Sequence, residues 1–361
     1  MTSILLTPTQ AGPLTLQNRM VMAPMTRSRA NGNLPNELMA EYYGQRSSVG
    51  LIVTEGTSPS PNGLGYARIP GLFTQQQANG WKAVTNAAHA GGARIFAQLM
   101  HTGRVGHEAN LPTLAEIIAP SAIAAAGQMW TDSQGMQDHP TPREMTAEDV
   151  KAAQQEFAEA ARLAVEAGFD GIELHSANGY LIEQFLAQNS NQRTDQYGGS
   201  DENRARFLLE TVDAVAEAIG KDKVGVRLSP YGVFNDITPY SEDMAEYLAN
   251  ELNARGIAYL HLVNHHSMGT PDVPESVVSK IRAAFKGVLI LSGGYDLARA
   301  EKDLESGIAN LVAFGRPFLA NPDLPYRFEI GAELATPDYA TFYTPGEKGY
   351  TDYPVLAEAA V

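Results

Sequence analysis

The stretch "TAEDVKAAQQEFAEAARLAVEAGFDGIELH", residues 146–175, contains two patterns in succession. Apolar residues recur at helical spacing up to Gly168, with Thr146 suited to cap the first turn and the glycine suited to end the last. The run "FDGIELH" (169–175) is then short and almost uniformly apolar, which is typical of a parallel strand covered on both faces. A helix followed directly by a buried strand indicates an α/β fold if the unit repeats.

The unit does repeat along the chain. Eight short apolar runs are present: "RMVMAP" (19–24), "GLIVTEG" (50–56), "ARIFAQL" (93–99), "FDGIELH" (169–175), "KVGVRLS" (223–229), "AYLHLV" (258–263), "GVLILSGG" (287–294) and "NLVAFG" (310–315). Helical periodicity covers 146–168, 200–220, 240–256 and 296–307. Ser200 and Gly220 suit the cap and the stop of the second helix. Eight strand–helix alternations predict a (β/α)₈ TIM barrel.

The alternative is an open, doubly wound sheet divided between two domains. No linker rich in Pro, Gly or Ser divides the chain, so we expect one domain over residues 1–361. Two segments depart from a plain barrel. Residues 1–18 include a hairpin-like pattern, which we expect to plug the bottom of the barrel. Residues 100–145 form a long excursion after the third strand, and connections of that length are typical of a lid or a binding segment.

The composition narrows the class of function. Asp and Glu total 41 against 26 for Lys and Arg, a net charge of −15, which argues against nucleic acid or an anionic membrane as partner and favours a small-molecule substrate. The absence of cysteine excludes disulfides, iron–sulfur clusters, thiolate zinc sites and a cysteine nucleophile. We see no signal peptide and no apolar run of about 20 residues. We therefore expect a cytoplasmic enzyme, either a monomer or a homodimer.

Polar residues and glycines gather where the predicted strands end, which is where TIM barrels carry their chemistry. These positions are Pro24, Met25, Thr26, Gly56, Gln98, His175, Arg227, Asn264, Gly293, Gly294, Gly315 and Arg316. No lysine ends a strand, which disfavours a Schiff-base aldolase. The histidines of "HLVNHH" (261–266) lie on one loop only, so we interpret them as a substrate-pocket or surface feature and not as a set of metal ligands. Glu55 and Glu173 could imitate a glycosidase pair, but interior glutamates paired with a buried arginine are the simpler interpretation.

Glycines and an arginine follow the last two strands. Either glycine pair alone could be a tight turn, but together with Arg316 they favour a phosphate site, the usual place for one in these barrels. Arg227 ends another strand, where a buried cation needs an anionic or electron-rich partner. Gln98 and Thr26 add neutral donors. Phosphate at one edge and donors in the middle describe a flat, hydrogen-bonding cofactor, for which flavin mononucleotide (FMN) is the natural candidate.

At these residues the sequence resembles the Old Yellow Enzyme family of FMN-dependent ene-reductases. The fragments that carry the likeness are "NRMVMAPMTRSRA" (18–30), "GLGYARIPG" (63–71), "IFAQLMHTGR" (95–104), "HSANGYLIEQFL" (175–186), "NQRTDQYGGSDENRARFLLE" (191–210), "FGRPFLANPDLP" (314–325) and "KGYTDYP" (348–354). They cover nearly the whole chain. Each fragment alone is weak evidence, whereas their order, spacing and number make the resemblance specific.

The resemblance implies a role for each matching residue. Ala23, Pro24, Met25 and Thr26 would lie along the flavin ring, Gly56 and Gln98 would make further flavin contacts, Arg227 would face its electron-accepting edge, and Gly293, Gly294, Gly315 and Arg316 would hold its phosphate. His175 and Asn178 would donate hydrogen bonds to the substrate, Tyr180 would be the proton donor, and Tyr66, Met100 and Tyr343 would line the substrate pocket.

The implied activity is the reduction of an electron-poor alkene such as an enone, enal, maleimide or nitroalkene. NADPH or NADH would reduce FMN, hydride would pass to the β-carbon, and Tyr180 would protonate the α-carbon. Three features depart from the commonest family pattern. Asn178 stands where many relatives have a second histidine, Met100 where bacterial relatives often have tryptophan, and the loop 264–275 matches poorly.

Other functions stay open at this point. The enzyme could act mainly on nitro compounds, nitrate esters or quinones. A hydroxy-acid oxidase would need paired arginines at the strand ends, which are lacking here, and a dienoyl-CoA reductase would need cysteines for its cluster. A flavin-binding barrel without catalysis is the alternative of another class, and the combination of His175 with Tyr180 argues against it.

Overall fold

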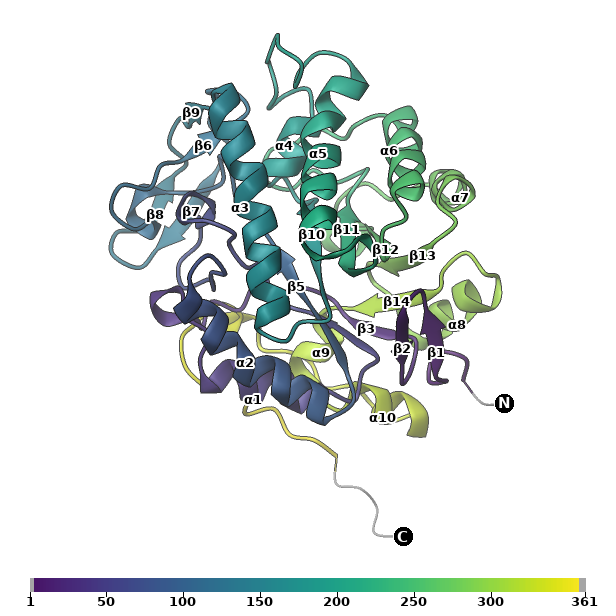
Figure 1. Ribbon diagram of the computed structural model, residues 1–361. Coiled ribbons are helices and arrows are strands. Elements are labelled where there is room, and N and C mark those ends of the chain that lie inside the picture. The colour runs from purple at the N-terminus through teal and green to yellow at the C-terminus, as the bar shows by residue number, and fades with distance from the viewer. Residues whose placement is uncertain (1–2, 357–361) are drawn as a thin grey trace.

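The computed structural model describes residues 3–356 and contains a closed barrel of eight parallel strands (Figure 1). The strands pair in chain order, and the last closes the barrel by pairing with the first. They are β3 (Met20–Met22), β4 (Leu51–Val53), β5 (Arg94–Leu99), β10 (Gly171–Ser176), β11 (Val224–Leu228), β12 (Tyr259–Val263), β13 (Val288–Ser292) and β14 (Leu311–Phe314). Each strand coincides with one of the eight apolar runs, so the predicted (β/α)₈ barrel is confirmed.

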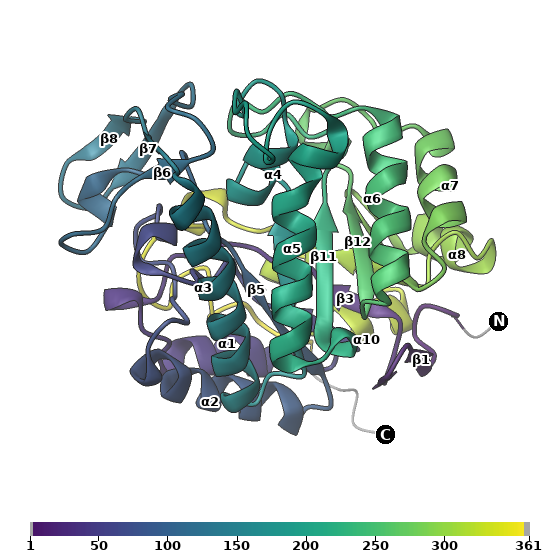
Figure 2. The same cartoon turned by 45° about the horizontal axis from the view of Figure 1, so that its top comes forward.

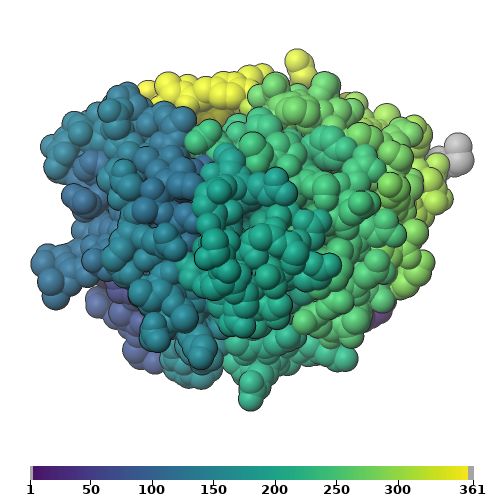
Figure 3. Space-filling view, turned by 90° about the horizontal axis from the view of Figure 1, so that it is seen from above, coloured from purple at the N-terminus to yellow at the C-terminus, as the bar shows by residue number. Residues whose placement is uncertain are grey.

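Helices surround the barrel, and α3, α5, α6 and α7 stand side by side on its outside (Figure 2). The helices are α1 (Glu37–Gln45), α2 (Gln75–Ala90), α3 (Ala147–Glu166), α4 (Leu181–Leu186), α5 (Asp201–Ile219), α6 (Glu242–Arg255), α7 (Glu275–Ala284), α8 (Leu297–Glu305), α9 (Arg316–Ala320) and α10 (Leu324–Ile330). Seen from above, successive segments occupy successive sectors of the surface, as a barrel built in chain order requires (Figure 3). Across residues 3–356 no helix is both long and apolar enough to cross a membrane.

The predicted helix boundaries have the expected physical cause. The Thr146 hydroxyl accepts from the backbone N–H of Asp149, whose carboxylate accepts in turn from the Thr146 backbone, and this reciprocal pair starts α3. Ser200 caps α5 in the same way through the N–H of Asn203. Gly220 ends that helix at φ +91°, a conformation that residues with a Cβ rarely adopt.

The N-terminal hairpin closes the bottom of the barrel. Strands β1 (Thr9–Ala11) and β2 (Leu14–Leu16) pair antiparallel. Leu16 is buried in one cluster with Leu51, Val53 and Phe96 from inside the barrel. Figure 2 shows the hairpin at the end of the barrel away from α4, so the predicted plug is confirmed.

The excursion after β5 forms a separate lobe beside α3 (Figure 1). Its strands are β6 (Ile118–Ala119), β7 (Gln128–Thr131), β8 (Gly135–Asp138) and β9 (Arg143–Glu144). The β7 and β8 strands make an antiparallel hairpin, whereas β6 and β9 pair in parallel and bring the two ends of the lobe together.

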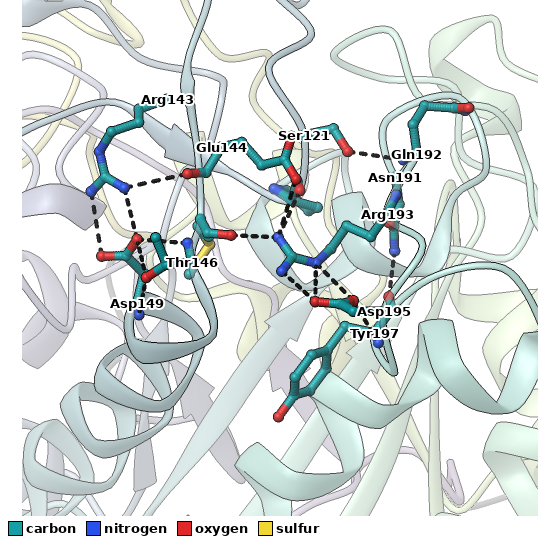
Figure 4. Close-up of polar contacts among 12 residues, drawn as sticks. Ser121, Arg143, Glu144, Thr146, Asp149, Asn191, Gln192, Arg193, Asp195 and Tyr197 are labelled. Atoms are coloured by element: carbon teal, nitrogen blue, oxygen red, sulfur yellow. Dashed lines mark hydrogen bonds and ion pairs between the residues drawn. The ribbon is translucent and has the colours of Figure 1, made fainter.

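One buried arginine fastens this lobe to the barrel (Figure 4). Arg193, in the loop before α5, donates through Nη1 to the backbone carbonyls of Pro120 and Met145 at 3.0 and 2.5 Å. Its Nε and Nη2 donate to the Asp195 carboxylate at 3.1 and 2.6 Å. Because those carbonyls flank β6 and β9, one guanidinium holds both ends of the lobe.

Candidate active site

A cavity of about 670 Å³ opens at the C-terminal ends of the barrel strands. It brings together the predicted site residues Ala23, Pro24, Met25, Thr26, Gln98, Met100, His175, Asn178, Tyr180, Arg227, Gly293, Gly294, Gly315, Arg316 and Tyr343. The two predicted residues outside its lining are Gly56 and Tyr66. Within residues 100–145, which the structure describes in full, only Met100 lines the cavity. The lid role of this excursion therefore stays a prediction.

The turn between β10 and α4 carries three of these side chains. Asn178 has φ +61°, which asparagine tolerates better than most residues, and Gly179 follows at +79°. Two hydrogen bonds hold the turn from below: the Asn178 N–H donates to Ser229 Oγ at 3.0 Å, and the Gly179 N–H donates to Glu183 Oε2 at 2.6 Å. Burial raises the pKa of Glu183 to about 8, although its hydrogen bonds oppose the rise.

His175 ends β10 and faces the cavity. Its side chain is buried, and its Nδ1 is without a hydrogen-bond partner among the described residues. Burial, with the charge of Arg227 as a second cause, holds the pKa of His175 well below its usual value of 6.5. The ring is therefore neutral near pH 7, with one N–H to donate. The Tyr180 ring stands edge-on to it, with the centroids 4.9 Å apart.

The Tyr180 hydroxyl is hydrogen-bonded to the Tyr66 hydroxyl at 3.1 Å. Tyr66 therefore supports Tyr180 from behind instead of lining the cavity itself. Burial raises the pKa of both phenols, and the hydrogen bond with Tyr66 partly offsets the rise at Tyr180. Both hydroxyls keep their protons at neutral pH.

Arg227 is the most unusual cation of the site. Its side chain is only 5% exposed, yet no described residue accepts a hydrogen bond from its guanidinium, and its Nε is buried without a partner. Burial lowers its pKa, while the Glu173 carboxylate opposes this effect without contacting it. A buried guanidinium without partners is costly, so its surroundings are complete only with a ligand that accepts hydrogen bonds.

Glu173 lies inside the barrel, on the same strand as His175. Its carboxylate accepts from Gln98 Nε2 at 2.8 Å, from the Tyr259 hydroxyl at 3.1 Å and from His261 Nδ1 at 2.8 Å. Burial alone would raise its pKa, but His261, Arg227 and Gln98 together lower it. The expected pairing with a buried arginine is thus wrong: no arginine contacts this carboxylate, and its titratable neighbour is His261, whose own pKa is lowered by burial. Residues 173 and 261 point inward because both alternate in phase with the other interior positions of their strands.

The glycines at the last two strand ends have different causes. Gly293 has φ +121°, and a Cβ there would lie 1.8 Å from the Asn264 carbonyl oxygen, so the backbone itself requires glycine. Gly315 has an ordinary φ of −99°, and its nearest neighbour to a Cβ would be Met25 Sδ at 3.5 Å. A Cβ at 315 would therefore not clash, although the ψ of −90° lies outside the region that residues with a Cβ favour. The missing side chain leaves its backbone open to a ligand in the cavity, beside Arg316.

Gly56 is explained by packing. A Cβ at this position would lie 2.5 Å from the Sδ and Cε atoms of Met100. Met100 lines the cavity and Gly56 does not, so the flavin contact of Gly56 stays a prediction.

The contacts that hold the C-terminal segment around Tyr343 were not predicted from the sequence. Tyr343 lies on a segment held by two buried arginines of "MTRSRA". Arg29 donates to the carbonyls of Thr341 and Phe342 at 2.8 and 2.7 Å, and Arg27 donates to the Gly349 carbonyl at 2.6 Å. The available signal was a pair of arginines directly after an apolar strand, where buried cations need acceptors.

The histidines of "HLVNHH" were expected to be a substrate-pocket or surface feature, and His265 is a pocket residue. Its side chain lines the cavity, and its Nε2 lies 2.6 Å from Asn178 Oδ1. A metal centre is not formed: no group of three or more potential ligands gathers within residues 3–356. The site is instead a hydrogen-bonding cavity lined by donors such as His175, Arg227 and Arg316.

Known proteins match this architecture. The model of the NADH:flavin oxidoreductase / NADH oxidase family matches residues 4–335. The chain belongs to this family. A Leishmania infantum protein named "Probable flavin mononucleotide-dependent alkene reductase" is 42% identical over 360 residues, covering 98% of each chain. The resemblance to the Old Yellow Enzyme family is thereby confirmed.

Solved structures of this family superpose closely. Morphinone reductase has a TM-score of 0.95 at 48% identity, covering 99% of this chain and 97% of its own. The same enzyme in complex with tetrahydroNAD gives 0.93 and 48%, with 98% of each chain covered. An old yellow enzyme homologue from Zymomonas mobilis gives 0.94 at 39% identity, covering 98% of this chain and 99% of its own.

The chain is accordingly a flavin-dependent oxidoreductase, with FMN as cofactor and a nicotinamide as reductant. The cavity fits FMN on its own evidence. The Arg227 guanidinium has no hydrogen-bond acceptor among the described residues, and a flavin ring could supply one. Gly315 leaves backbone exposed beside Arg316 where a phosphate would lie. Gln98 and Thr26 line the space between these two ends.

Proposed function

We propose that the chain reduces electron-poor alkenes such as enones, enals, maleimides or nitroalkenes, using NADPH or NADH. The observation that carries the proposal is the β10–α4 turn. It presents His175, Asn178 and Tyr180 to the same cavity as the unpartnered Arg227. Two donors and a proton source beside a flavin site are what conjugate reduction requires.

His175 and Asn178 would bind the oxygen that activates the alkene. A neutral imidazole N–H and an amide N–H are donors that do not themselves need a counter-ion. Their hydrogen bonds strengthen as negative charge develops on that oxygen, which lowers the barrier more than it stabilises the ground state. Bound FMN would supply the two-electron chemistry that links the nicotinamide to the alkene.

Tyr180 would give its proton to the α-carbon. Burial keeps its pKa above the usual value, so the phenol stays protonated at neutral pH. The Tyr66 hydroxyl, 3.1 Å away, can donate to the phenolate oxygen as the proton leaves. This second hydroxyl makes Tyr180 a better acid than burial alone would allow.

The remaining residues would bind the cofactor. We assign Ala23, Pro24, Met25, Thr26 and Gln98 to the flavin ring, Arg227 to its electron-accepting edge, and Gly293, Gly294, Gly315 and Arg316 to the phosphate. Met100 and Tyr343 would contact the substrate. The cavity lining supports these assignments, and it supports Gly56 and Tyr66 only as neighbours of Met100 and Tyr180.

A second candidate is reduction of nitro compounds, nitrate esters or quinones. The His175–Asn178 pair favours it equally, because both side chains can donate to any such oxygen. Reduction of these compounds does not require protonation of a carbon atom. The effect of removing the Tyr180 hydroxyl therefore distinguishes the two candidate reactions.

The test is an anaerobic absorbance titration of the holoenzyme with NADPH or NADH, followed by 2-cyclohexenone. We expect bleaching of the flavin band and its recovery with the enone. Tyr180→Phe should leave bleaching unchanged and slow recovery by about 10²- to 10⁴-fold. Tyr66→Phe is the matched comparison: it keeps the proton donor and removes only the hydroxyl that supports the phenolate, so it should slow recovery far less than Tyr180→Phe. Unchanged recovery in Tyr180→Phe would remove the proton-donor role, and no recovery in the wild type would favour the second candidate.

A further inference from the structure

The loop after β12 contributes a histidine to the substrate-binding turn. His265 Nε2 lies 2.6 Å from Asn178 Oδ1, well within hydrogen-bond distance. An amide oxygen only accepts hydrogen bonds, so the facing ring nitrogen must carry a proton. The contact joins segments 87 positions apart in the chain.

The surroundings of both residues fix this arrangement. The backbone of Asn178 is held at φ +61°, and its backbone carbonyl accepts a hydrogen bond from Asn235 Nδ2 at 2.7 Å. The backbone at this position therefore cannot turn freely. The His265 ring stands edge-on to Phe234, with centroids 4.7 Å apart and planes at 87°. Burial, with Arg227, Arg316 and His261 as further causes, lowers the pKa of His265 to about 3. The ring is neutral, so its single proton decides what it can donate.

With Oδ1 engaged by His265, the other end of the amide is left for the cavity. No described residue accepts a hydrogen bond from Asn178 Nδ2, although Asn178 lines the cavity. If the amide were turned over, its oxygen would face the cavity and repel a ligand oxygen. The orientation of this one amide therefore decides whether the His175–Asn178 pair offers two donors or a donor and an acceptor.

We propose that His265 is a positioning residue that donates its Nε2–H to Asn178 Oδ1 and thereby holds Nδ2 toward the cavity. This makes the pair specific for ligands that present an oxygen acceptor. The inference rests on the proposed function for its ligand class. The hydrogen bond itself is independent of that function.

The first measurement reads the His265 tautomer in the full-length holoenzyme by ¹⁵N NMR with labelled histidine, assigned by loss of the signal in His265→Gln. We expect protonated Nε2 and bare Nδ1. A proton on Nδ1 would overturn the proposal, because Nε2 would then accept from a reversed amide.

The second measurement is a double-mutant cycle on the dissociation constant of 2-cyclohexenone from the oxidised holoenzyme. His265→Leu should weaken binding by about 3- to 10-fold, the value of one hydrogen bond. His265→Gln can still donate and should recover most of the affinity. In an Asn178→Ala background, His265→Leu should change the affinity by less than about twofold.

Equal effects of His265→Leu in both backgrounds would overturn the proposal, because they would mean that His265 acts on the ligand or the fold directly. FMN affinity serves as the control and should not change. If the wild type binds no enone, the proposed function fails while the tautomer measurement still decides the role of His265.

Discussion

Two buried arginines, Arg193 and Arg227, show how differently this protein uses the same side chain. Arg193 directs its donors at the carbonyls of Pro120 and Met145 and at the Asp195 carboxylate (Figure 4). Arg227 is at least as buried, yet it donates to no described residue. A buried cation whose partners are all protein groups completes the fold. One without protein partners indicates a ligand.

The largest expected effect follows from Arg227→Met. Losing the charge-assisted hydrogen bonding that this guanidinium would give the flavin should weaken FMN binding by on the order of 10²- to 10⁴-fold. The free energy of unfolding of the apoprotein should stay equal or rise, because the variant removes a costly unpaired charge. Fluorescence titration of apoprotein with FMN and urea unfolding measure the two quantities. Unchanged FMN affinity would mean that Arg227 does not bind the cofactor and that the two arginines do not differ in this way.

Arg193→Met should have the opposite profile. Two buried carbonyls would lose their donor, so the free energy of unfolding should fall by about 3 kcal/mol while FMN affinity is retained. Arg143→Met is the matched control. That arginine lies on the same lobe, but its side chain is 41% exposed and its partners Glu116 and Asp149 are 55% and 26% exposed, so its loss should cost less than about 1 kcal/mol. Equal costs for the two variants would show that Arg193 is no special anchor.

His175 is a second buried group of the cavity without a protein partner among the described residues, and its effect is measured through the pH dependence of the free energy of unfolding. Its pKa in the folded protein lies well below 6.5, so below that pH the unfolded chain takes up a proton that the folded apoprotein does not. Stability must therefore fall as pH falls, by about 1.4 kcal/mol per pH unit for this group. His175→Asn should make the slope between pH 6.5 and 5 shallower by that amount, as measured by urea unfolding. An unchanged slope would mean that the folded protein accommodates the charged ring.

The smallest expected effect concerns Gly315. Alanine has room at this position, but its ψ of −90° is unfavourable for a residue with a Cβ, so Gly315→Ala should lower the free energy of unfolding by only about 1 kcal/mol. FMN affinity should fall by about 3- to 10-fold because the phosphate loses close approach to the backbone. Riboflavin, which lacks the phosphate, should bind both proteins alike. Gly293→Ala, which would clash with the Asn264 carbonyl, should instead destabilise the fold itself.

The barrel could be read from the sequence because its signals are local. The alternation of uniformly apolar runs with helical periodicity depends on neighbouring residues, and so do the caps at Thr146 and Ser200. The candidate residues were equally accessible, since the C-terminal ends of barrel strands share one face. Most of them do line the cavity. Whether each plays its assigned role is still a prediction.

The contacts of individual buried residues could not be predicted from the sequence. Glu173 was expected beside an arginine and contacts His261 instead, and the packing of Gly56 against Met100 was not predicted. These outcomes depend on the stagger of one strand against another, which no local pattern encodes.

The sequence by itself determined the repeating unit, the cap positions, the location of the chemistry and the absence of cysteine-based sites. Only the tertiary structure decided which buried polar groups satisfy one another and which are left for a ligand. The physical reason is that burying a polar group is costly unless a partner meets it within about 3 Å. For Arg193 the chain provides that partner from distant segments, and for Arg227 it does not.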